Sequence, residues 1–244
     1  MNDGLRHPPP AQAKKVLVLH DLRPDADNAA WRGGQLARAH GGWLRVLHLG
    51  RFGNPEVARV RLAPLAWRLQ EHLQLAVLAH AVRGPFTGEL RRAAEEAHLV
   101  VISAPTGLDA AMGLHPLRVA RLAGRPTLVV RTPATAPYRR VLVGAEPDGG
   151  MEYGLLAAAA MADGKEAPAV ARLHSAAALL ERERALFPDL VVLPCTPTTS
   201  LARRFLAHTR ADTLLLPMAP APAGSTSAHT VAFHGIAAAV PRAP

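Results

Sequence analysis

The residues best placed to do chemistry follow a short apolar run in the middle of the chain. Residues 99–102 (LVVI) are too few for a helix, and Ser103, Pro105 and Gly107 come directly after them. This pattern predicts a buried strand that ends in a turn. Open α/β sheets bind their ligands in the loops that follow the strands. We therefore expect any small-molecule site to include this loop.

Three side chains of the types found in hydrolytic triads lie at or near the ends of predicted strands: Asp21, His48 and Ser103. The chain has no Gly-x-Ser-x-Gly elbow to present the serine, so we predict no triad and no catalytic residue. An acid after a strand also serves as a turn or capping residue, which leaves two interpretations of Asp21 open.

Metal and thiol chemistry find little support in the sequence. The 12 histidines show neither HxH nor HxxxH spacing, so no metal site is predicted. Cys195 is the only cysteine, and no neighbouring histidine or basic run would activate it. We interpret it as an inert thiol.

The elements that would position these side chains alternate between strand and helix. Short apolar runs predict buried strands, and runs with apolar residues three or four apart predict helices. Asp25 to Asn28 are candidate N-caps of the first helix. The predicted strands are 16–19, 44–49, 75–82, 99–102 and 127–130, and the predicted helices are about 28–39, 56–73, 87–97 and 113–122. This alternation predicts a doubly wound parallel sheet in a first domain over 14–133.

The pattern starts again after a linker at 132–137. VLV at 141–143 repeats VLV at 16–18, LVVL at 190–193 repeats LVVI at 99–102, and TLLL at 213–216 repeats TLVV at 127–130. We therefore predict a second domain over 138–218, with helices near 151–162, 176–186 and 200–208 and a strand near 168–173. This copy is about forty residues shorter, which indicates that one strand and one helix are missing. Residues 1–13 and 219–244 are predicted to be a flexible arm and an Ala/Pro-rich tail.

Composition narrows the class of protein. Hydrophobic residues make up 49% of the 244 residues, which favours a folded chain, and no apolar run is long enough to cross a membrane. The formal charge of +9 invites a nucleic-acid interpretation, but the arginines are spread singly and no recognition motif or interleaved aromatics accompany them. We predict neither nucleic-acid nor membrane binding. A single cysteine and no secretory signal indicate the cytoplasm.

With these residues in view, the chain resembles the universal stress proteins of the UspA type, in tandem form with a degenerate second domain. The resemblance rests on segments from both copies: VLVLHD at 16–21, NAAWRGGQLARAHGGWLRVLHL at 28–49, GLHPLRVARLAGRPTLVVR at 113–131, VLVGAE at 141–146 and SLARRFLAHTRADTLLLP at 200–217. It implies an adenine-nucleotide alpha hydrolase-like sheet with strand order 3-2-1-4-5 in the first domain.

The resemblance also implies where a nucleotide would bind. Nucleotide-binding members carry a Gly-x2-Gly-x9-Gly-Ser/Thr loop, whose small residues let backbone N–H groups approach phosphates. Here the first two glycines are replaced, the spacer is about three residues short, and Asp109 adds a negative charge. The candidate residues of this degenerate site are Asp21, His48, Ser103, Thr106, Gly107 and Gly113. We predict weak or no ATP binding through 103–114 and no required cofactor.

Three functional hypotheses follow from this resemblance. The first is a non-catalytic stress-response protein in which the last strands, around Val129 and Leu215, pair to form an internal pseudo-dimer. Such pairing would cover two apolar edges that otherwise invite aggregation. The second is an ATP-binding protein with weak ATPase activity, which keeps adenine nucleotides as candidate ligands. The third is a regulatory protein that binds a partner or DNA, and a homodimer is also compatible with the resemblance.

Overall fold

The structure is a computed structural model, and it describes residues 13–50, 54–104, 115–145, 151–162, 167–172, 175–195 and 200–217. The strands are β1 Lys15–Leu19, β2 Trp43–Gly50, β3 Val77–Arg83, β4 Leu99–Ser103, β5 Thr127–Val130, β6 Val141–Ala145, β7 Ala169–Arg172, β8 Leu190–Cys195 and β9 Asp212–Pro217. The helices are α1 Pro24–Ala39, α2 Pro55–Leu73, α3 Phe86–Glu95, α5 Pro116–Ala123, α6 Met151–Met161, α7 Ala176–Leu186 and α8 Ser200–His208.

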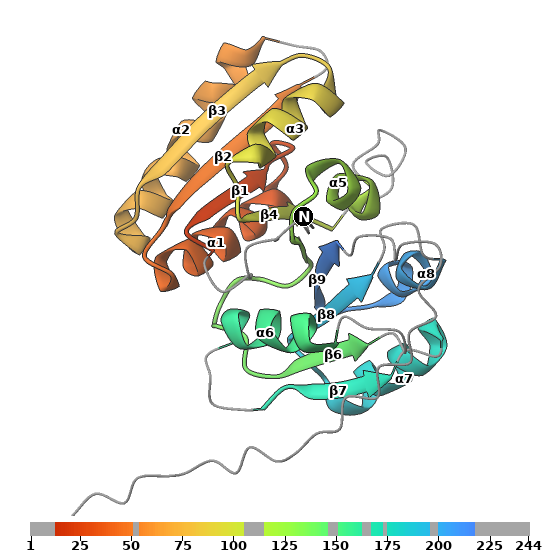
Figure 1. The fold of residues 1–244 in the computed structure, drawn as a ribbon. Coiled ribbons are helices and arrows are strands. Elements are labelled where there is room, and N and C mark those ends of the chain that lie inside the picture. Colours follow the sequence, from red (N-terminus) through yellow and green to blue (C-terminus); the bar gives the residue numbers. More distant parts are fainter. Residues whose placement is uncertain are drawn as a thin grey trace, which may run out of the picture.

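All nine strands form one continuous sheet in the order β3-β2-β1-β4-β5-β9-β8-β6-β7 (Figure 1). The first five strands are parallel to one another and have the predicted order 3-2-1-4-5, which confirms the predicted fold class. The last four strands are also mutually parallel. Only the pair β5–β9 is antiparallel, with Val129 opposite Thr213 and Thr127 opposite Leu215. The two predicted terminal runs therefore do lie side by side, in the centre of the sheet.

The second half follows the topology of the first with one strand fewer. Its order β7-β6-β8-β9 corresponds to β2-β1-β4-β5, so the strand without a counterpart among the described residues is β3. The predicted boundaries of two domains, at 133 and 138, stay a prediction, because the sheet runs without interruption from one half to the other.

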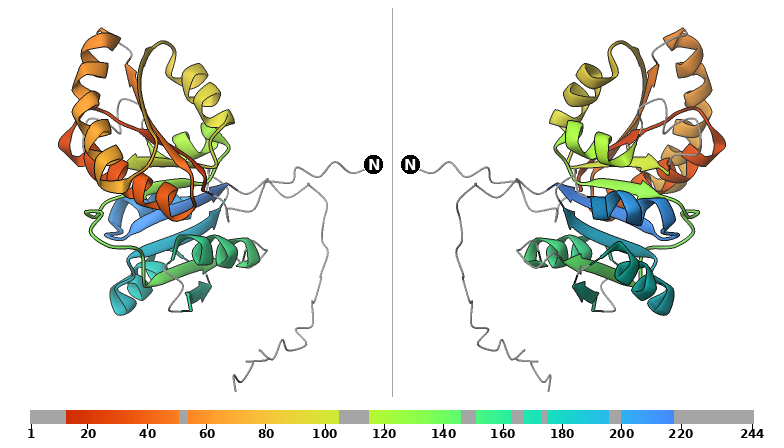
Figure 2. Two further views of the ribbon diagram at one scale, coloured as in Figure 1. Left: turned by 90° about the vertical axis from the view of Figure 1, so that its left-hand side faces the viewer. Right: turned by 90° about the vertical axis from the view of Figure 1, so that its right-hand side faces the viewer.

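Helices cover both faces of this sheet, as Figure 2 shows from two sides. One core lies under α1, α2 and α6 and includes Val16 and Val18 of β1 and Val141 and Val143 of β6. The other lies under α3, α5, α7 and α8. Parallel strands buried on both faces read as continuous apolar runs, which explains why these short runs could be recognised in the sequence.

Close helix packing in the two halves uses a glycine in each. A Cβ added to Gly33 of α1 would come within 2.8 Å of the Val18 side chain, and one added to Gly154 of α6 within 2.8 Å of the Val143 side chain. These two glycines let α1 and α6 approach equivalent strands, β1 and β6.

One detail of the sequence prediction is wrong. Helix α1 begins at Pro24, after an extended Arg23, so Asp25 and Asp27 lie inside its first turn and do not cap it. Proline suits the first helical position because its missing N–H would have no partner there, and acids in the first turn complement the helix dipole. Ala13, the last residue of the predicted arm, is buried with 3% of its surface exposed, and the rest of that arm lies outside the described residues. The tail at 219–244 lies outside the described residues.

Candidate functional site

The described part of the predicted nucleotide site lies at the carboxyl ends of β1, β2 and β4. Leu19 is paired with Leu47 on one side and Ile102 on the other, so the next row of the sheet holds His20, His48 and Ser103. Because side chains alternate along a strand, these three face the side of the sheet that α1 covers. Thr106, Gly107 and Gly113 lie outside the described residues.

Asp21 serves the local turn between β1 and α1. Its Oδ1 accepts a hydrogen bond of 3.0 Å from the backbone N–H of Arg23. The intervening Leu22 has a φ of 66°, a left-handed conformation that such a turn requires. Of the two interpretations left open for Asp21, the turn role is therefore present in the structure.

His20 is a residue of this edge that the sequence analysis missed. It is buried, its Nδ1 accepts the Leu22 N–H at 3.0 Å, and its Nε2 lies 3.0 Å from Asp27 Oδ1. The bond at Nδ1 places the ring proton on Nε2, which donates to Asp27. Burial lowers the pKa of His20, against the raising effect of its hydrogen bond to Asp27. The signal that could have found it is a histidine directly after a buried strand, with an acid in the first turn of the helix that follows.

His48 is bonded to the same turn. Its Nδ1–H donates to the His20 carbonyl at 2.8 Å, which leaves Nε2 as the free ring nitrogen. Among the described residues, no hydrogen bond joins Asp21, His48 and Ser103 to one another. This edge can present an imidazole nitrogen and the Ser103 hydroxyl to a ligand, but these three residues form no proton relay.

A second polar region lies at the same edge of the sheet, where the linker of residues 131–140 crosses the starts of β9 and β8. Because the two halves run in opposite directions, the carboxyl end of β5 and the amino end of β6 lie at one edge. The linker must pass two strands, about 14 Å. The linker is hydrogen-bonded to one acid at each of these two strands: Asp212 at the start of β9 and Asp189 before β8.

Asp212 is completely buried and satisfied by the linker. Its Oδ1 accepts from the backbone N–H groups of Arg131 at 2.7 Å and Thr132 at 3.0 Å, and its Oδ2 accepts from the Tyr138 hydroxyl at 2.6 Å. The guanidinium of Arg32, 4% exposed, stacks 4.2 Å over the Tyr138 ring. Burial and the nearby Asp212 raise the pKa of Tyr138 well above its ordinary value. This network holds the linker against α1.

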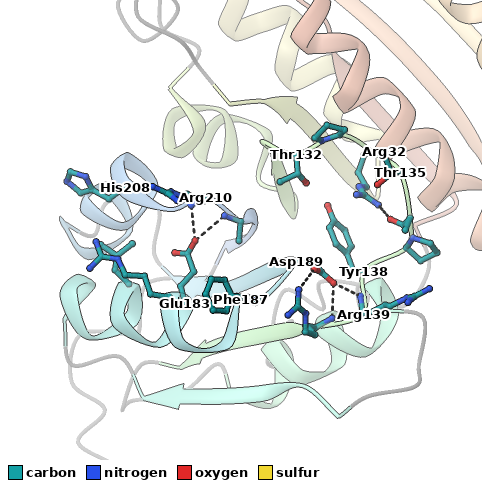
Figure 3. A pocket seen from close by; sticks show the side chains of 18 residues that line it. Arg32, Thr132, Thr135, Tyr138, Arg139, Glu183, Phe187, Asp189, His208 and Arg210 are labelled. Atoms are coloured by element: carbon teal, nitrogen blue, oxygen red, sulfur yellow. Dashed lines mark hydrogen bonds and ion pairs between the residues drawn. The ribbon is translucent and has the colours of Figure 1, made fainter.

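A hollow of about 1170 Å³ opens beside this network, between the linker, the end of α7 and the turn before β9 (Figure 3). Arginines dominate the charged side chains around it, and the two carboxylates that line it are Glu183 and Asp189. Sequence reasoning missed this hollow entirely, since its residues come from four separate parts of the sequence: Arg32 and residues within 132–140, 180–189 and 208–211.

The described residues also bear on two other classes of feature, a metal centre and a membrane-spanning helix. They contain no group of three or more His, Cys, Asp and Glu side chains able to hold a metal ion. No helix among them combines the length and apolar character needed to cross a membrane.

Comparison with known proteins identifies the fold. No protein-family model matches the sequence, and no curated protein matches it. Solved structures do match: a universal stress protein from Archaeoglobus fulgidus superposes with a TM-score of 0.67 and 12% identity, over 85% of this chain and 97% of that one. A functionally unknown protein from Pseudomonas aeruginosa superposes with a TM-score of 0.60 and 16% identity, over 85% and 94%. The resemblance noted in the sequence is thus confirmed at the level of structure, and this chain has the universal stress protein fold.

Proposed function

We propose that this chain is a stress-response protein of the universal stress family that works by binding and not by catalysis. The observation that supports this most is the end-to-end likeness to the Archaeoglobus fulgidus universal stress protein, of which 97% is covered. The likeness extends across both halves of the sheet and does not stop at one domain.

The geometry at the carboxyl ends of β1, β2 and β4 supports a non-catalytic role. The Asp21 carboxylate accepts from the Arg23 N–H, and the Nδ1–H of His48 donates to a backbone carbonyl. A general base must reach the proton it abstracts, and a nucleophile must contact its base. Neither relation exists between Asp21, His48 and Ser103.

Binding of ATP through residues 103–114 is proposed to be weak or absent. A phosphate cradle needs several N–H groups directed at one point, and Pro105 lacks one. Isothermal titration calorimetry with Mg-ATP tests this on the full chain, and we expect a Kd weaker than about 1 mM. A phosphate-release assay run in parallel should show no turnover above buffer.

The matched variants are Gly113→Leu, in the loop, and Gly88→Leu, in α3, where an added Cβ meets nothing within 4 Å. If ATP binds with micromolar affinity and only the Gly113→Leu variant loses this binding, residues 103–114 form a functional nucleotide site. The nucleotide-binding hypothesis would then replace ours.

The single-chain pairing of β5 with β9 is proposed to take the place of an interface between two subunits. A Val129→Cys/Thr213→Cys pair, in a Cys195→Ser background, should oxidise to an intramolecular disulfide because these positions are opposed in the sheet. The offset pair Thr127→Cys/Thr213→Cys is the control and should crosslink far less. Native mass spectrometry should give a monomer; a stable homodimer that prevents the crosslink would contradict this arrangement.

A further inference from the structure

Arginines from separate segments converge on the hollow beside the linker. They are Arg32 from α1, Arg139 and Arg140 from the linker, Arg184 from α7 and Arg210 from the turn before β9. Figure 3 labels three of these lining residues, Arg32, Arg139 and Arg210, which come from widely separated parts of the sequence. Arg32 is buried and bonded to the linker carbonyl of Ala136, whereas the other four are exposed.

The two carboxylates of the hollow bind the main chain of these arginines. Asp189 Oδ2 accepts the backbone N–H groups of Arg139 and Arg140, each at 3.0 Å. Glu183, 8% exposed, accepts the backbone N–H of Arg210 at 2.8 Å through its Oε1. Partial burial raises the pKa of Asp189, but the hydrogen bonds from Arg140 and Arg139 outweigh it and leave that pKa below the ordinary value. The acids therefore hold the arginines in position.

The guanidinium groups stay available as a result. In the part of the chain that the structure describes, no hydrogen bond or ion pair reaches the guanidinium of Arg139, Arg184 or Arg210. That of Arg140 has one long contact of 3.4 Å with Asp189. Four exposed cations thus face two carboxylates, whose oxygens are largely directed at backbone N–H groups. The backbones of Arg139, Arg140 and Arg210 are thus held by these acids, while their guanidinium donors remain available.

The edge of the hollow also carries an aromatic ring in a strained backbone. Phe187 ends α7 with φ 47° and ψ 54°, and 69% of its surface is exposed. A left-handed conformation is costly for a bulky residue, and residues held in this way cluster at binding sites. An exposed ring there gives a ligand an apolar surface beside the cationic one.

We propose that this hollow binds a multiply charged, phosphate-bearing small molecule. The planar fork of the guanidinium matches phosphate oxygens with two parallel hydrogen bonds, and the bonds to Asp189 and Glu183 fix the backbone from which three of these side chains extend. The volume of about 1170 Å³ leaves room for a metabolite-sized ligand. The site is distinct from the predicted nucleotide site at the carboxyl ends of β1, β2 and β4, so it goes beyond the proposed function and does not depend on it.

The test uses the full chain and two probes at low ionic strength. Isothermal titration calorimetry with inorganic pyrophosphate and with fructose 1,6-bisphosphate should show one site per chain. The triple variant Arg139→Gln/Arg184→Gln/Arg210→Gln should weaken binding at least about tenfold. A charge-matched triple on the first half, Arg91→Gln/Arg118→Gln/Arg121→Gln, should leave the affinity unchanged. Circular dichroism spectra of both triple variants and of the single variant Arg184→Glu show whether each protein still folds. A variant that folds but binds the probes more weakly has lost binding and not its fold.

Three results would overturn the proposal. The first is no saturable binding of either probe to the wild-type chain. The second is an equal loss in both triple variants, because binding would then follow total charge and not this hollow. The third is tighter binding of duplex DNA that the Arg139/Arg184/Arg210 triple removes, which would assign these arginines to a nucleic-acid surface.

Discussion

In each half of the sheet, a side chain closes the junction between the helix before the penultimate strand (α3 or α7) and the turn before the last strand (β5 or β9). The two side chains that do this have opposite charges. In the first half, the Arg125 side chain, before β5, donates to the carbonyls of Ala94 at 3.2 Å and Glu95 at 2.8 Å, at the end of α3. In the second half, the Glu183 side chain, in α7, accepts from the Thr209 hydroxyl and from the N–H groups of Arg210 and Ala211, before β9. One junction uses a cation on the turn, and the other an acid on the helix.

This difference determines whether an arginine beside this junction is used in closing it or left unpaired. A helix end has unpaired carbonyls and a turn has unpaired N–H groups, so a side chain of either charge can join the two. When an arginine does so, as Arg125 does, its guanidinium is used. When Glu183 does so, the guanidinium of Arg210 is left for the hollow. The choice at one junction therefore changes what the neighbouring surface can bind.

The largest expected effect comes from removing Asp212. This residue has no acidic counterpart in the first half, because the equivalent position in the repeat, directly before Thr127, is Pro126. Asp212→Ala should lower the free energy of unfolding by about 3–5 kcal/mol, because buried Arg32 and the Tyr138 hydroxyl lose their partner. Urea denaturation measures this. The exposed Asp25→Ala is the control, expected within about 0.5 kcal/mol of wild type. A comparable loss in both variants would mean that the linker network contributes nothing specific.

Replacing Glu183 and Arg125, one at a time, with alanine tests the comparison of the two junctions directly. Glu183→Ala should cost about 2–3 kcal/mol, since the buried Ala211 N–H, the buried Thr209 hydroxyl and the partly buried Arg210 N–H lose their acceptor. Arg125→Ala should cost about 0.5–1.5 kcal/mol, because the Ala94 carbonyl keeps its hydrogen bond from the Ala97 N–H and the bond to the Glu95 carbonyl is exposed. Both values come from chemical denaturation. If Arg125→Ala is the more damaging change, our ranking of the two junctions is wrong.

A glycine substitution at the end of α7 and one at the end of α3 should change the free energy of unfolding in opposite directions. Phe187→Gly should raise the free energy of unfolding by about 0.5–1 kcal/mol, because glycine adopts the left-handed conformation without strain and little packing is lost. Glu96, at the end of α3, has an ordinary φ of −90°, so Glu96→Gly should destabilise by a similar amount. Thermal melts followed by circular dichroism would show the two shifts. A destabilised Phe187→Gly variant would reveal packing of this ring that we have not recognised.

The smallest effect is the pH dependence of stability that His20 contributes. It is confined to the first half, because the equivalent position in the second half of the repeat is Ala145, which does not titrate. Burial lowers the pKa of folded His20 below its ordinary 6.5, so the unfolded chain takes up the proton first. Stability contributed by neutral His20 is therefore present above about pH 6.5 and is lost as the pH falls below it. The slope is at most about 1.4 kcal/mol per pH unit. His20→Asn should flatten it between neutral and mildly acidic pH.

The His20→Asn slope will not vanish, because burial also lowers the pKa values of His80 and His115. A wild-type slope that equals the variant's would show that His20 contributes no pH dependence.

The sequence by itself determined the strands, the helices and the doubly wound order. Each strand buried on both faces appears as a local apolar run, such as 16–19 or 190–193, and this signal needs no knowledge of distant residues. The repeat of these runs indicated two halves and the loss of one strand. It also placed Asp21, His48 and Ser103 near strand ends, because parallel strands share one carboxyl edge.

Only the tertiary structure decided which strand was lost, how the linker is held and where the free cations gather. Asp212 meets Tyr138 at a separation of 74 residues, and Arg32 meets Ala136 at 104. No local spacing encodes such contacts, because they depend on the antiparallel pairing of β5 with β9, which brings the end of one half to the start of the other. The same limit explains His20 and Glu183: each is an unremarkable polar residue in the sequence until folding buries it beside its partners.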